Sequence, residues 1–415
     1  MKFINRKYEL NVLKERFLNE LPEMMIIYGR RRVGKTELIR EFLTGVNGIY
    51  LLCREESEFS QLQRFSSIIA AHFNDEVLLK NPSRNWDALL EYINNKSEKR
   101  LILIIDEFPY LLKSSPALPS IIQDYWDNKL RHKKLFLVLC GSSMGMMENL
   151  MEYKSPLYGR RTGQLLIKPF IFKDAIKFFP NYDIKEKIQA YAILGGTAAY
   201  LSQFTDNISI KETIKRNILR KDAFLFMDPI FILREELNEP GYYFSILKSI
   251  ANGNTKLGNI VNDTGLSKGI VGKYLSVLID LHLIEREVPI TEFHPQKTRK
   301  GLYKIKDNFF RFWFGAVYPY LEYIEQSNTD FVLNKAVNFM NKIVPFTYEY
   351  VCREFLVELN QKNNLPFIFF RVGRWWHNEN EIDIVALNEE TKEILFCECK
   401  WQEKKAGLKI LNELK

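Results

Sequence analysis

Short apolar runs alternate with segments of helical periodicity along the first third of the chain. Each run is short enough for one buried strand, and the segments between the runs place apolar residues three or four positions apart. The pattern predicts strands over Met24–Tyr28, Ile49–Cys53, Leu101–Ile105, Leu135–Cys140 and Leu165–Phe170, and helices over Lys35–Leu43, Phe59–Phe73, Trp86–Ile93 and Leu118–Leu130. Strands that alternate with helices favour an α/β fold, a parallel sheet with helices on both faces.

Three further segments follow this predicted sheet domain, 1–171. Residues 172–236 show helical periodicity alone, which predicts a helical lid. Residues 237–306 predict a winged helix: helices over Tyr242–Ala251, Leu257–Asn262 and Val271–Leu281, then a hairpin over Ile284–Thr291 and Leu302–Ile305. Residues 307–415 predict an α/β domain with a helix that opens at Pro345, followed by strands over 381–386 and 394–401.

The turn after the first predicted strand matches the GxxxxGK[ST] pattern at every defined position. It reads Gly29-Arg30-Arg31-Arg32-Val33-Gly34-Lys35-Thr36, between a strand and a helix. The glycines let backbone N–H groups surround phosphate oxygens, Lys35 is expected to reach the β- and γ-phosphates, and Thr36 is expected to ligate Mg²⁺. We assign this P-loop, with the adjacent Glu37, to ATP binding.

Polar residues that follow the third and fourth strands complete the predicted hydrolytic site. Asp106 and Glu107 end an apolar strand at the carboxyl edge of the sheet, where ligands bind. Asp106 is predicted to hold Mg²⁺, and Glu107 to polarise the attacking water as the general base. Ser142 is predicted to lie beside the γ-phosphate, with a plain strand-end turn as the alternative. Arg160, which is followed by Arg161, is predicted to neutralise transition-state charge, with a surface basic pair as the alternative.

The predicted wing is basic, whereas the predicted recognition helix carries only Lys268 and Lys273. Such a wing could lie along DNA phosphates. The alternative is an adaptor that packs against protein. The cations of the wing are Lys297, Arg299, Lys300, Lys304 and Lys306.

Charged residues interrupt the two apolar strands near the C-terminus. Glu398 and Lys400 lie two positions apart and therefore share a strand face, with Asp383 on the neighbouring strand. Asp383 and Glu398 are predicted to hold Mg²⁺ or Mn²⁺, and Lys400 to orient the attacking water. This is the D…ExK constellation of restriction-endonuclease-like nucleases. Charges within an apolar run need partners or a metal, which favours a site over a chance pattern.

Composition narrows the class of protein. The 415 residues include 59 basic and 51 acidic side chains, a net charge of +8 that is compatible with a DNA partner but typical also of ordinary surfaces. No apolar run approaches the ~18 residues of a membrane span, and the start lacks the apolar core of a secretion signal, so we expect a cytoplasmic protein. Five cysteines without a CxxC pattern predict reduced thiols, and five histidines without HxxxH or HExxH spacing argue against a zinc enzyme.

Together these motifs resemble the archaeal-type AAA ATPases, STAND-like P-loop proteins that carry a C-terminal nuclease-like domain of unknown function. The resemblance extends from Phe3–Arg6 to Gly373–Trp376 and beyond. It implies that the segment of Arg6 packs near the adenine, and that Glu349 on a helix joins Asp383, Glu398 and Lys400 in a catalytic set. Residues 194–198 are similar to the family's Gly-Gly-x-Pro lid turn, but alanine replaces the proline.

Our first hypothesis is an ATPase whose nucleotide state positions a winged helix and a nuclease-like domain on DNA, with metal-dependent cleavage. The second is a nucleotide-dependent signalling or defence switch whose C-terminal domain binds without cleaving, and the third is a transcription-type regulator. The intact Asp383, Glu398 and Lys400 favour the first. Lys415 falls in a helix expected after Trp401, whereas the nuclease-like fold normally adds a further strand, so either the sequence is a fragment or the C-terminal sheet is incomplete. The sequence leaves open whether the chain forms a homo-oligomer.

Overall fold

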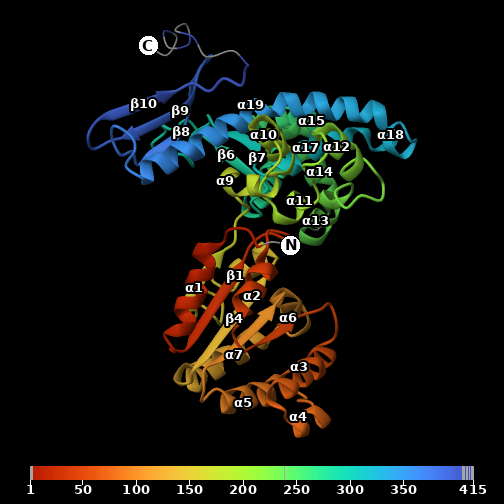
Figure 1. Ribbon diagram of the computed structural model, residues 1–415, viewed down its shortest axis with the longest axis vertical. Coiled ribbons are helices and arrows are strands. Elements are labelled where there is room, and N and C mark those ends of the chain that lie inside the picture. The colour runs from red at the N-terminus through yellow and green to blue at the C-terminus, as the bar shows by residue number, and fades with distance from the viewer. Residues whose placement is uncertain (1–2, 238, 404–406, 408–409, 411, 413–415) are drawn as a thin grey trace. The chain divides into compact units, whose positions relative to one another are not determined.

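Two compact units make up the chain, residues 1–168 and residues 169–415 (Figure 1). The computed structural model describes residues 3–237, 239–403, 407, 410 and 412. Within these residues, no helix combines the length and the apolar character that crossing a membrane requires.

The first unit is built on a five-stranded, entirely parallel sheet in the order β2-β3-β4-β1-β5. Every residue of β1, β3 and β4 is buried, as expected for a sheet with both faces covered. The predicted α/β fold is confirmed. The fifth strand is shorter than predicted and ends before Pro169, which has no N–H to donate. The bounds are β1 Glu23–Tyr28, β2 Gly48–Leu52, β3 Leu101–Asp106, β4 Leu135–Gly141 and β5 Gly163–Leu166.

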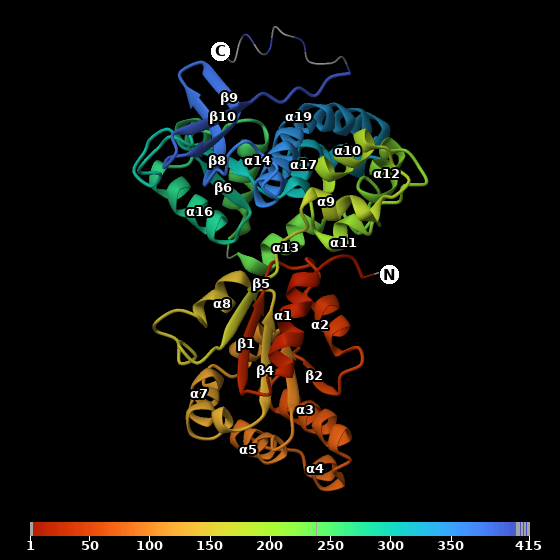
Figure 2. The ribbon, with the colours of Figure 1, turned by 60° about the vertical axis from the view of Figure 1, so that its left-hand side comes forward.

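Helices cover both faces of this sheet (Figure 2). On one face, α1 and α2 pack through Leu13, Leu38 and Phe42 against Phe136 of β4 and its neighbours. On the other face lie α3, α5, α6 and α7. The bounds are α1 Lys7–Leu18, α2 Lys35–Leu43, α3 Glu58–Phe73, α4 Glu76–Lys80, α5 Trp86–Lys96, α6 Phe108–Ser114, α7 Leu118–Asn128 and α8 Met144–Asn149, with a 3₁₀ turn η1 at Leu130–His132.

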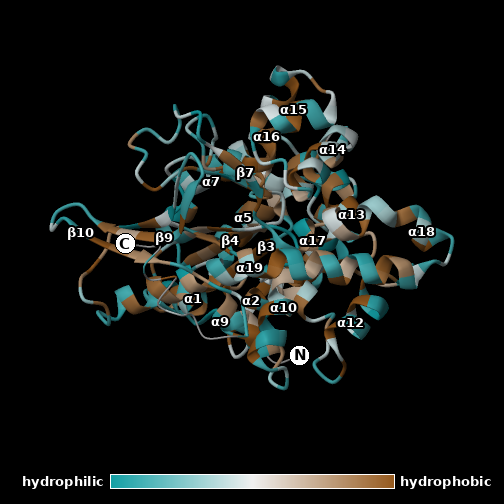
Figure 3. Ribbon diagram, turned by 90° about the horizontal axis from the view of Figure 1, so that it is seen from above, coloured by the Kyte–Doolittle hydropathy of each residue, from teal (hydrophilic) through white to brown (hydrophobic). Residues whose placement is uncertain are grey.

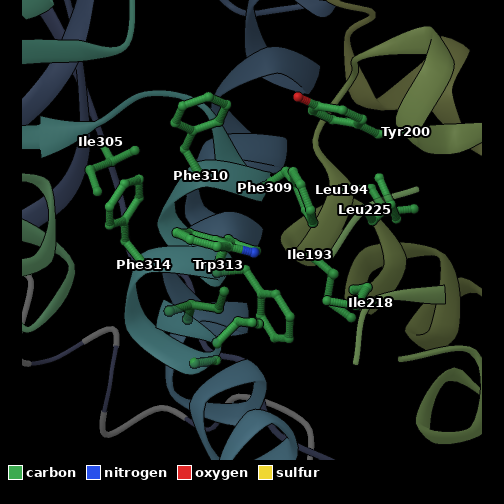
Figure 4. Packing of buried hydrophobic residues seen from close by; sticks show 14 of the residues in the cluster. Ile193, Leu194, Tyr200, Ile218, Leu225, Ile305, Phe309, Phe310, Trp313 and Phe314 are labelled. Carbon is green, nitrogen blue, oxygen red and sulfur yellow. The ribbon is translucent and has the colours of Figure 1, made fainter. Parts of the chain in front are cut away.

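The second unit is mainly helical, and one hydrophobic core runs through its residues 170–344. Helix α17 lies at the centre, with Trp313 fully buried and its indole N–H donating to the carbonyl of Phe226 at 2.7 Å. Figure 4 shows Phe309, Trp313 and their neighbours meeting side chains from α10. The bounds are α9 Phe172–Ala175, η2 Ile176–Phe178, α10 Ile184–Leu194, α11 Ala198–Leu201, α12 Ile210–Asn217, α13 Asp228–Glu236, α17 Asn308–Ala316, η3 Tyr318–Tyr320, α18 Leu321–Glu325 and α19 Thr329–Gln361.

The elements predicted for a winged helix occur in the predicted order. Ser267 caps the third helix, its hydroxyl accepting from the N–H of Ile270, as its place before that helix suggested. The two strands that follow pair antiparallel and enclose a long loop. The bounds are α14 Pro240–Ala251, α15 Leu257–Thr264, α16 Lys268–Asp280, β6 Ile284–Glu287 and β7 Leu302–Ile305.

The C-terminal segment forms a three-stranded antiparallel sheet, β10-β9-β8, in which β9 and β10 are largely hydrophobic (Figure 3). The strands are β8 Arg371–His377, β9 Asn380–Asn388 and β10 Glu393–Cys397. Residues 373–376, which the resemblance singled out, lie within β8, a strand that the sequence analysis did not predict. The expected strand over 394–401 stops at Cys397, because the N–H of Cys399 bonds a side-chain carboxylate in place of a neighbouring strand.

Helix α19 corrects a second expectation. Pro345 lies inside this 33-residue helix and does not open it. A proline removes only one helix N–H, and the buried neighbours Ile343, Val344 and Thr347 hold the turn in place. The helix expected after Trp401 falls mostly outside the described residues.

Candidate functional site

The P-loop follows β1 directly and leads into α2. A Cβ atom on Gly29 would lie 2.4 Å from the carbonyl oxygen of Ile167, and Gly34 has a φ of 101° as the N-cap of α2, so both positions require glycine. Arg32 also takes a left-handed conformation, with a φ of 71°. No side chain caps α2. Its first N–H groups, at the positive end of the helix dipole, therefore suit an anion.

Lys35 lies folded back over the P-loop. Its Nζ donates to the carbonyl of Gly29 at 2.8 Å and to that of Arg30 at 2.9 Å, and the residue is only 4% exposed. Burial lowers the pKa of Lys35, while the nearby Asp106 and Glu107 act in the opposite direction. The structure thus holds the predicted phosphate ligand at the loop, paired with neutral carbonyls.

Asp106, at the end of β3, is buried and accepts hydrogen bonds at both carboxylate oxygens. Its Oδ2 accepts from Tyr50 Oη at 2.7 Å and from Thr36 Oγ1 at 3.1 Å, and its Oδ1 accepts from the N–H of Glu107 at 2.9 Å. The predicted pair of Thr36 and Asp106 is therefore together. The sequence analysis placed Tyr50 in a predicted strand, Ile49–Cys53, but did not predict that it belongs to the site. The sequence held no signal for this contact, because it depends on the register of β2 against β3, in which Tyr50 pairs with Ile104, on the same sheet face as Asp106.

Glu107 opens α6 in a left-handed conformation, with a φ of 54°. Its Oε1 accepts from the hydroxyl of Ser142 at 2.6 Å. Ser142 is buried just beyond β4, so the ends of neighbouring strands bring these two predicted residues together. A non-glycine residue in this backbone region is strained, and such strain gathers at functional sites.

Arg6 joins the N-terminal segment to the P-loop. It is buried, and its Nη2 donates to the carbonyl of Val33 at 3.0 Å and to that of Lys168 at 2.6 Å. Its Nη1 bonds Glu9 at 3.1 Å. Arg6 therefore contacts the loop predicted to hold nucleotide. Arg31 extends toward α6, where its Nη2 donates to Tyr110 Oη at 3.4 Å.

Arg160 is engaged by a carboxylate on α7. Its Nε and Nη2 both bond Asp127, the latter at 2.7 Å. Arg161 donates to Gln164 at 2.7 Å. Burial raises the pKa of Tyr28, the last residue before the P-loop, and the charge of Arg161 only partly opposes this rise. In this conformation Arg160 is bound to Asp127, whereas Arg161 lies near enough to the end of β1 for its charge to act on Tyr28. Glu37 is exposed and pairs only locally, with a residue one turn along α2.

A second group of predicted residues gathers beside the C-terminal sheet. Asp383 is 9% exposed, and its Oδ2 accepts from the N–H of Cys399 at 2.8 Å. Lys400 Nζ pairs with Glu398 Oε1 at 2.7 Å. Asp383 precedes Ile384, which pairs with Cys397, the last residue of β10, and Glu398 follows directly, so Asp383 and Glu398 lie at the same end of this strand pair.

Electrostatics tie these residues to Glu349 on α19. Burial and the charge of Asp383 raise the pKa of Glu349 to about 7. The pKa of Asp383 is raised by burial and by Glu398, and the pKa of Lys400 is raised by its bond to Glu398. The four predicted residues therefore interact. Within the described part of the chain, however, no three His, Cys, Asp or Glu side chains are grouped closely enough to form a ready metal site.

The wing cations divide into paired and exposed groups. Lys300 pairs with Glu292 and Lys304 with Glu287, each at 2.5 Å. The other three, which are exposed to solvent, are Lys297, Arg299 and Lys306.

Two protein families match parts of this chain. Residues 3–204 match a family described as an ATPase domain predominantly from Archaea. Residues 313–410 match a family described as archaeal and bacterial proteins of unknown function.

Relatives extend the match over nearly the whole chain. An uncharacterised protein of Methanocaldococcus jannaschii is 39% identical over 404 residues, which cover 97% of this chain and 88% of that protein. An uncharacterised ATP-binding protein of the same organism is 51% identical over 41 residues, or 10% of this chain and 70% of that protein. Among solved structures, a Walker-type ATPase of Pyrococcus abyssi is 23% identical and has a TM-score of 0.56, over 75% of this chain and 96% of its own. This last likeness concerns the fold alone.

Proposed function

This chain belongs to a family of predominantly archaeal proteins in which a P-loop ATPase domain precedes a domain of unknown function, and we propose that it binds and hydrolyses ATP. The observation that carries the proposal is the arrangement of Lys35, Thr36, Asp106 and Glu107 at the ends of β1 and β3. A cation, a hydroxyl and two carboxylates beside an uncapped helix N-terminus are what phosphoryl transfer from ATP requires.

Each residue has a distinct part in binding. The N–H groups of the P-loop and of α2 hold the phosphates, and Lys35 exchanges its two loop carbonyls for phosphate oxygens. The hydroxyl of Thr36 donates a hydrogen bond to Asp106 Oδ2 at 3.1 Å. These two oxygens are ligands of the kind that Mg²⁺ prefers. Held by Thr36 and Asp106, Mg²⁺ would neutralise charge at the β- and γ-phosphates.

Glu107 acts as the general base in hydrolysis. Its carboxylate takes the proton from the attacking water, and the hydroxyl of Ser142 orients it through the 2.6 Å hydrogen bond. Arg6 keeps the N-terminal segment against Val33 of the P-loop, where the base of the nucleotide binds.

Calorimetry of ATP binding and measurement of phosphate release test this proposal. Lys35→Ala should weaken ATP binding by roughly two to three powers of ten, because it removes the charge that faces the phosphates. Glu107→Gln should keep binding and lose turnover, because the amide accepts no proton. Lys14→Ala, on an exposed position of α1, is the matched control. Tight ATP binding by the Lys35 variant would contradict the P-loop assignment.

The second part of the proposal is DNA binding by residues 237–306, controlled by nucleotide state. The exposed Lys297 and Arg299, on a hairpin that follows three helices, support it. Replacing both by glutamate should weaken binding to all sequences alike, and should flatten the salt dependence by about one unit per lost phosphate contact. The same double replacement at Lys335 and Lys342, exposed on α19, controls for net charge. Unchanged binding would assign the DNA surface elsewhere.

A second candidate activity is metal-dependent DNA cleavage by the C-terminal domain, as in a restriction-endonuclease-like nuclease. The ion pair of Lys400 with Glu398 at 2.7 Å, next to Asp383, which accepts from the N–H of Cys399 at 2.8 Å, favours it, and the pKa of Glu349 is raised by burial and by Asp383. Asp383 and Glu398 offer the oxygen ligands that suit Mg²⁺ or Mn²⁺, which would polarise a phosphodiester. Lys400 then orients the water.

Linear, branched and single-stranded DNA with Mg²⁺ or Mn²⁺ test this candidate. Asp383→Ala or Glu398→Ala should abolish cleavage and leave ATP turnover intact, whereas Glu393→Ala, exposed on β10, should change neither. If the parent protein binds no divalent ion by calorimetry and cuts no DNA, with or without ATP, the domain is a binding module. The protein is then better described as a nucleotide-dependent signalling or defence switch.

A further inference from the structure

The hairpin loop between β6 and β7, residues 288–301, exposes an aromatic ring at its tip. Phe293 is 82% exposed, although a phenylalanine ring gains most when it is buried. A solvated ring of this size on a loop is a candidate contact for a ligand.

Hydrogen bonds and an ion pair cross the loop that carries this ring. Arg286 on β6 donates from Nη1 to the carbonyl of Pro295 at 2.6 Å and from Nη2 to the carbonyl of Thr298. Glu292 and Lys300 pair at 2.5 Å and join the two limbs of the loop. Because the backbone around Phe293 is already fixed by these bonds, little ordering entropy opposes a contact there.

The charged residues near the ring indicate that its ligand is negatively charged. Glu292, the acidic residue beside Phe293, is neutralised by Lys300, and this pairing lowers the pKa of Glu292. Lys297 and Arg299 are exposed and have no acidic partner anywhere in the described ranges 3–237 and 239–403. A flat apolar face with two uncompensated cations matches a polyanion that carries stacked rings.

We propose that Phe293 stacks on an unpaired base of DNA while Lys297 and Arg299 contact the flanking phosphates. The inference rests on the DNA binding proposed above, and narrows its ligand to DNA that has unpaired bases: a single strand, a fork or a junction. In an intact duplex the bases are already stacked on one another, so only the phosphate contacts remain.

Fluorescence anisotropy with the full chain tests this. The probes are a single strand, a fork and a blunt duplex of equal length. Phe293→Ala should lower affinity for the single strand and the fork by about tenfold or more, and should change affinity for the duplex less than twofold. Phe293→Trp should restore the loss, because it keeps a stacking face. Phe59→Ala removes another exposed ring, at 59% exposure, and should change nothing.

The outcomes separate this inference from the function on which it rests. If the parent protein binds DNA but Phe293→Ala weakens all three probes equally, or none, then stacking is overturned and phosphate contact stands. If the parent protein binds no probe, then DNA binding itself fails. If Phe293→Ala instead abolishes self-association in light scattering and leaves DNA affinity unchanged, the ring is a protein contact and the inference is wrong.

Discussion

Tyr50 should control ATP turnover although it lies outside the P-loop. Its phenol donates at 2.7 Å to the same Asp106 oxygen that Thr36 contacts. Burial and Asp106 raise the pKa of Tyr50, so the phenol keeps its proton at every physiological pH. Replacement by phenylalanine keeps the ring in β2 and deletes only this hydroxyl.

The size of the effect follows from the charge of the acceptor. A hydrogen bond to an ionised group contributes roughly 1.5–3 kcal/mol. If the bond serves to orient Asp106 in the transition state, its loss lowers kcat/KM by roughly ten- to a hundredfold. The concentration of Mg²⁺ needed for half-maximal turnover should rise, whereas ATP binding without the metal should hardly change, because Lys35 and the loop N–H groups are untouched.

A matched control exists in the same unit. Tyr92 Oη donates to Asp75 Oδ2 at 2.8 Å, and its pKa is likewise raised by burial and by its aspartate. Tyr92→Phe therefore removes a bond of the same kind, and should lower stability as Tyr50→Phe does while sparing phosphate release. Equal kinetics for the two variants and the parent would refute a role for Tyr50 in positioning Asp106. Equal losses in both would mean that unit stability alone sets the rate.

Ser142→Ala should lower kcat about tenfold at unchanged ATP affinity, because it deletes a hydroxyl bonded to a carboxylate; full activity in phosphate-release assays would remove Ser142 from the site. Burial raises the pKa of Glu354 above its ordinary 4.5, so its stabilising contribution is full below that pH and is lost as pH rises through the raised pKa. Glu354→Gln should therefore melt higher than the parent at pH 8, with no advantage near pH 4; an equal advantage at both would contradict this. Gly196→Ala should unfold the second unit, because its Cβ would lie 1.8 Å from a backbone oxygen, whereas Gly241→Ala has open space; similar melting temperatures would contradict the packing.

The strands of the first unit were predictable because the short apolar runs in the sequence are the segments that the sheet buries completely. In runs such as Leu101–Ile105 every residue is buried, as expected for a strand in a parallel sheet with both faces covered. The P-loop is equally local, since its glycines, lysine and threonine are neighbours in sequence. Their hydrogen bonds therefore follow from a single turn.

Contacts between distant segments were not predictable. Tyr50 meets Asp106 only through the pairing of β2 with β3, and Arg160 meets Asp127 only through the packing beneath α7. The alternation within one strand predicts on which sheet face a side chain lies, but it does not predict which residue of the neighbouring strand lies beside it. A basic pair likewise gives charge but not the carboxylate that binds it.

The second unit shows the same limit at the level of domains. Periodicity predicted helices α14, α15 and α16 to within three residues at either end, but it did not predict which segments they pack against. Asn308 on α17 donates to the carbonyl of Tyr191 on α10 at 2.9 Å, across more than a hundred residues. One core thus joins segments that the sequence presents as a lid, a winged helix and the start of a third domain.

Hydrogen bonds within this unit join the wing to the sheet that carries the C-terminal carboxylates. The N–H of Ile290, at the base of the wing, donates to the carbonyl of Arg374 on β8 at 2.9 Å, and Arg371 donates back to the carbonyl of Ile290. Strand β8 pairs with β9, which carries Asp383. Burial and Asp383 raise the pKa of Glu349 on α19, and the charge of Lys304 on the hairpin is near enough to oppose part of this rise. Because these bonds fix the wing to the sheet, DNA held by the wing would stand in a set relation to Asp383, whether the carboxylates cut it or only bind it.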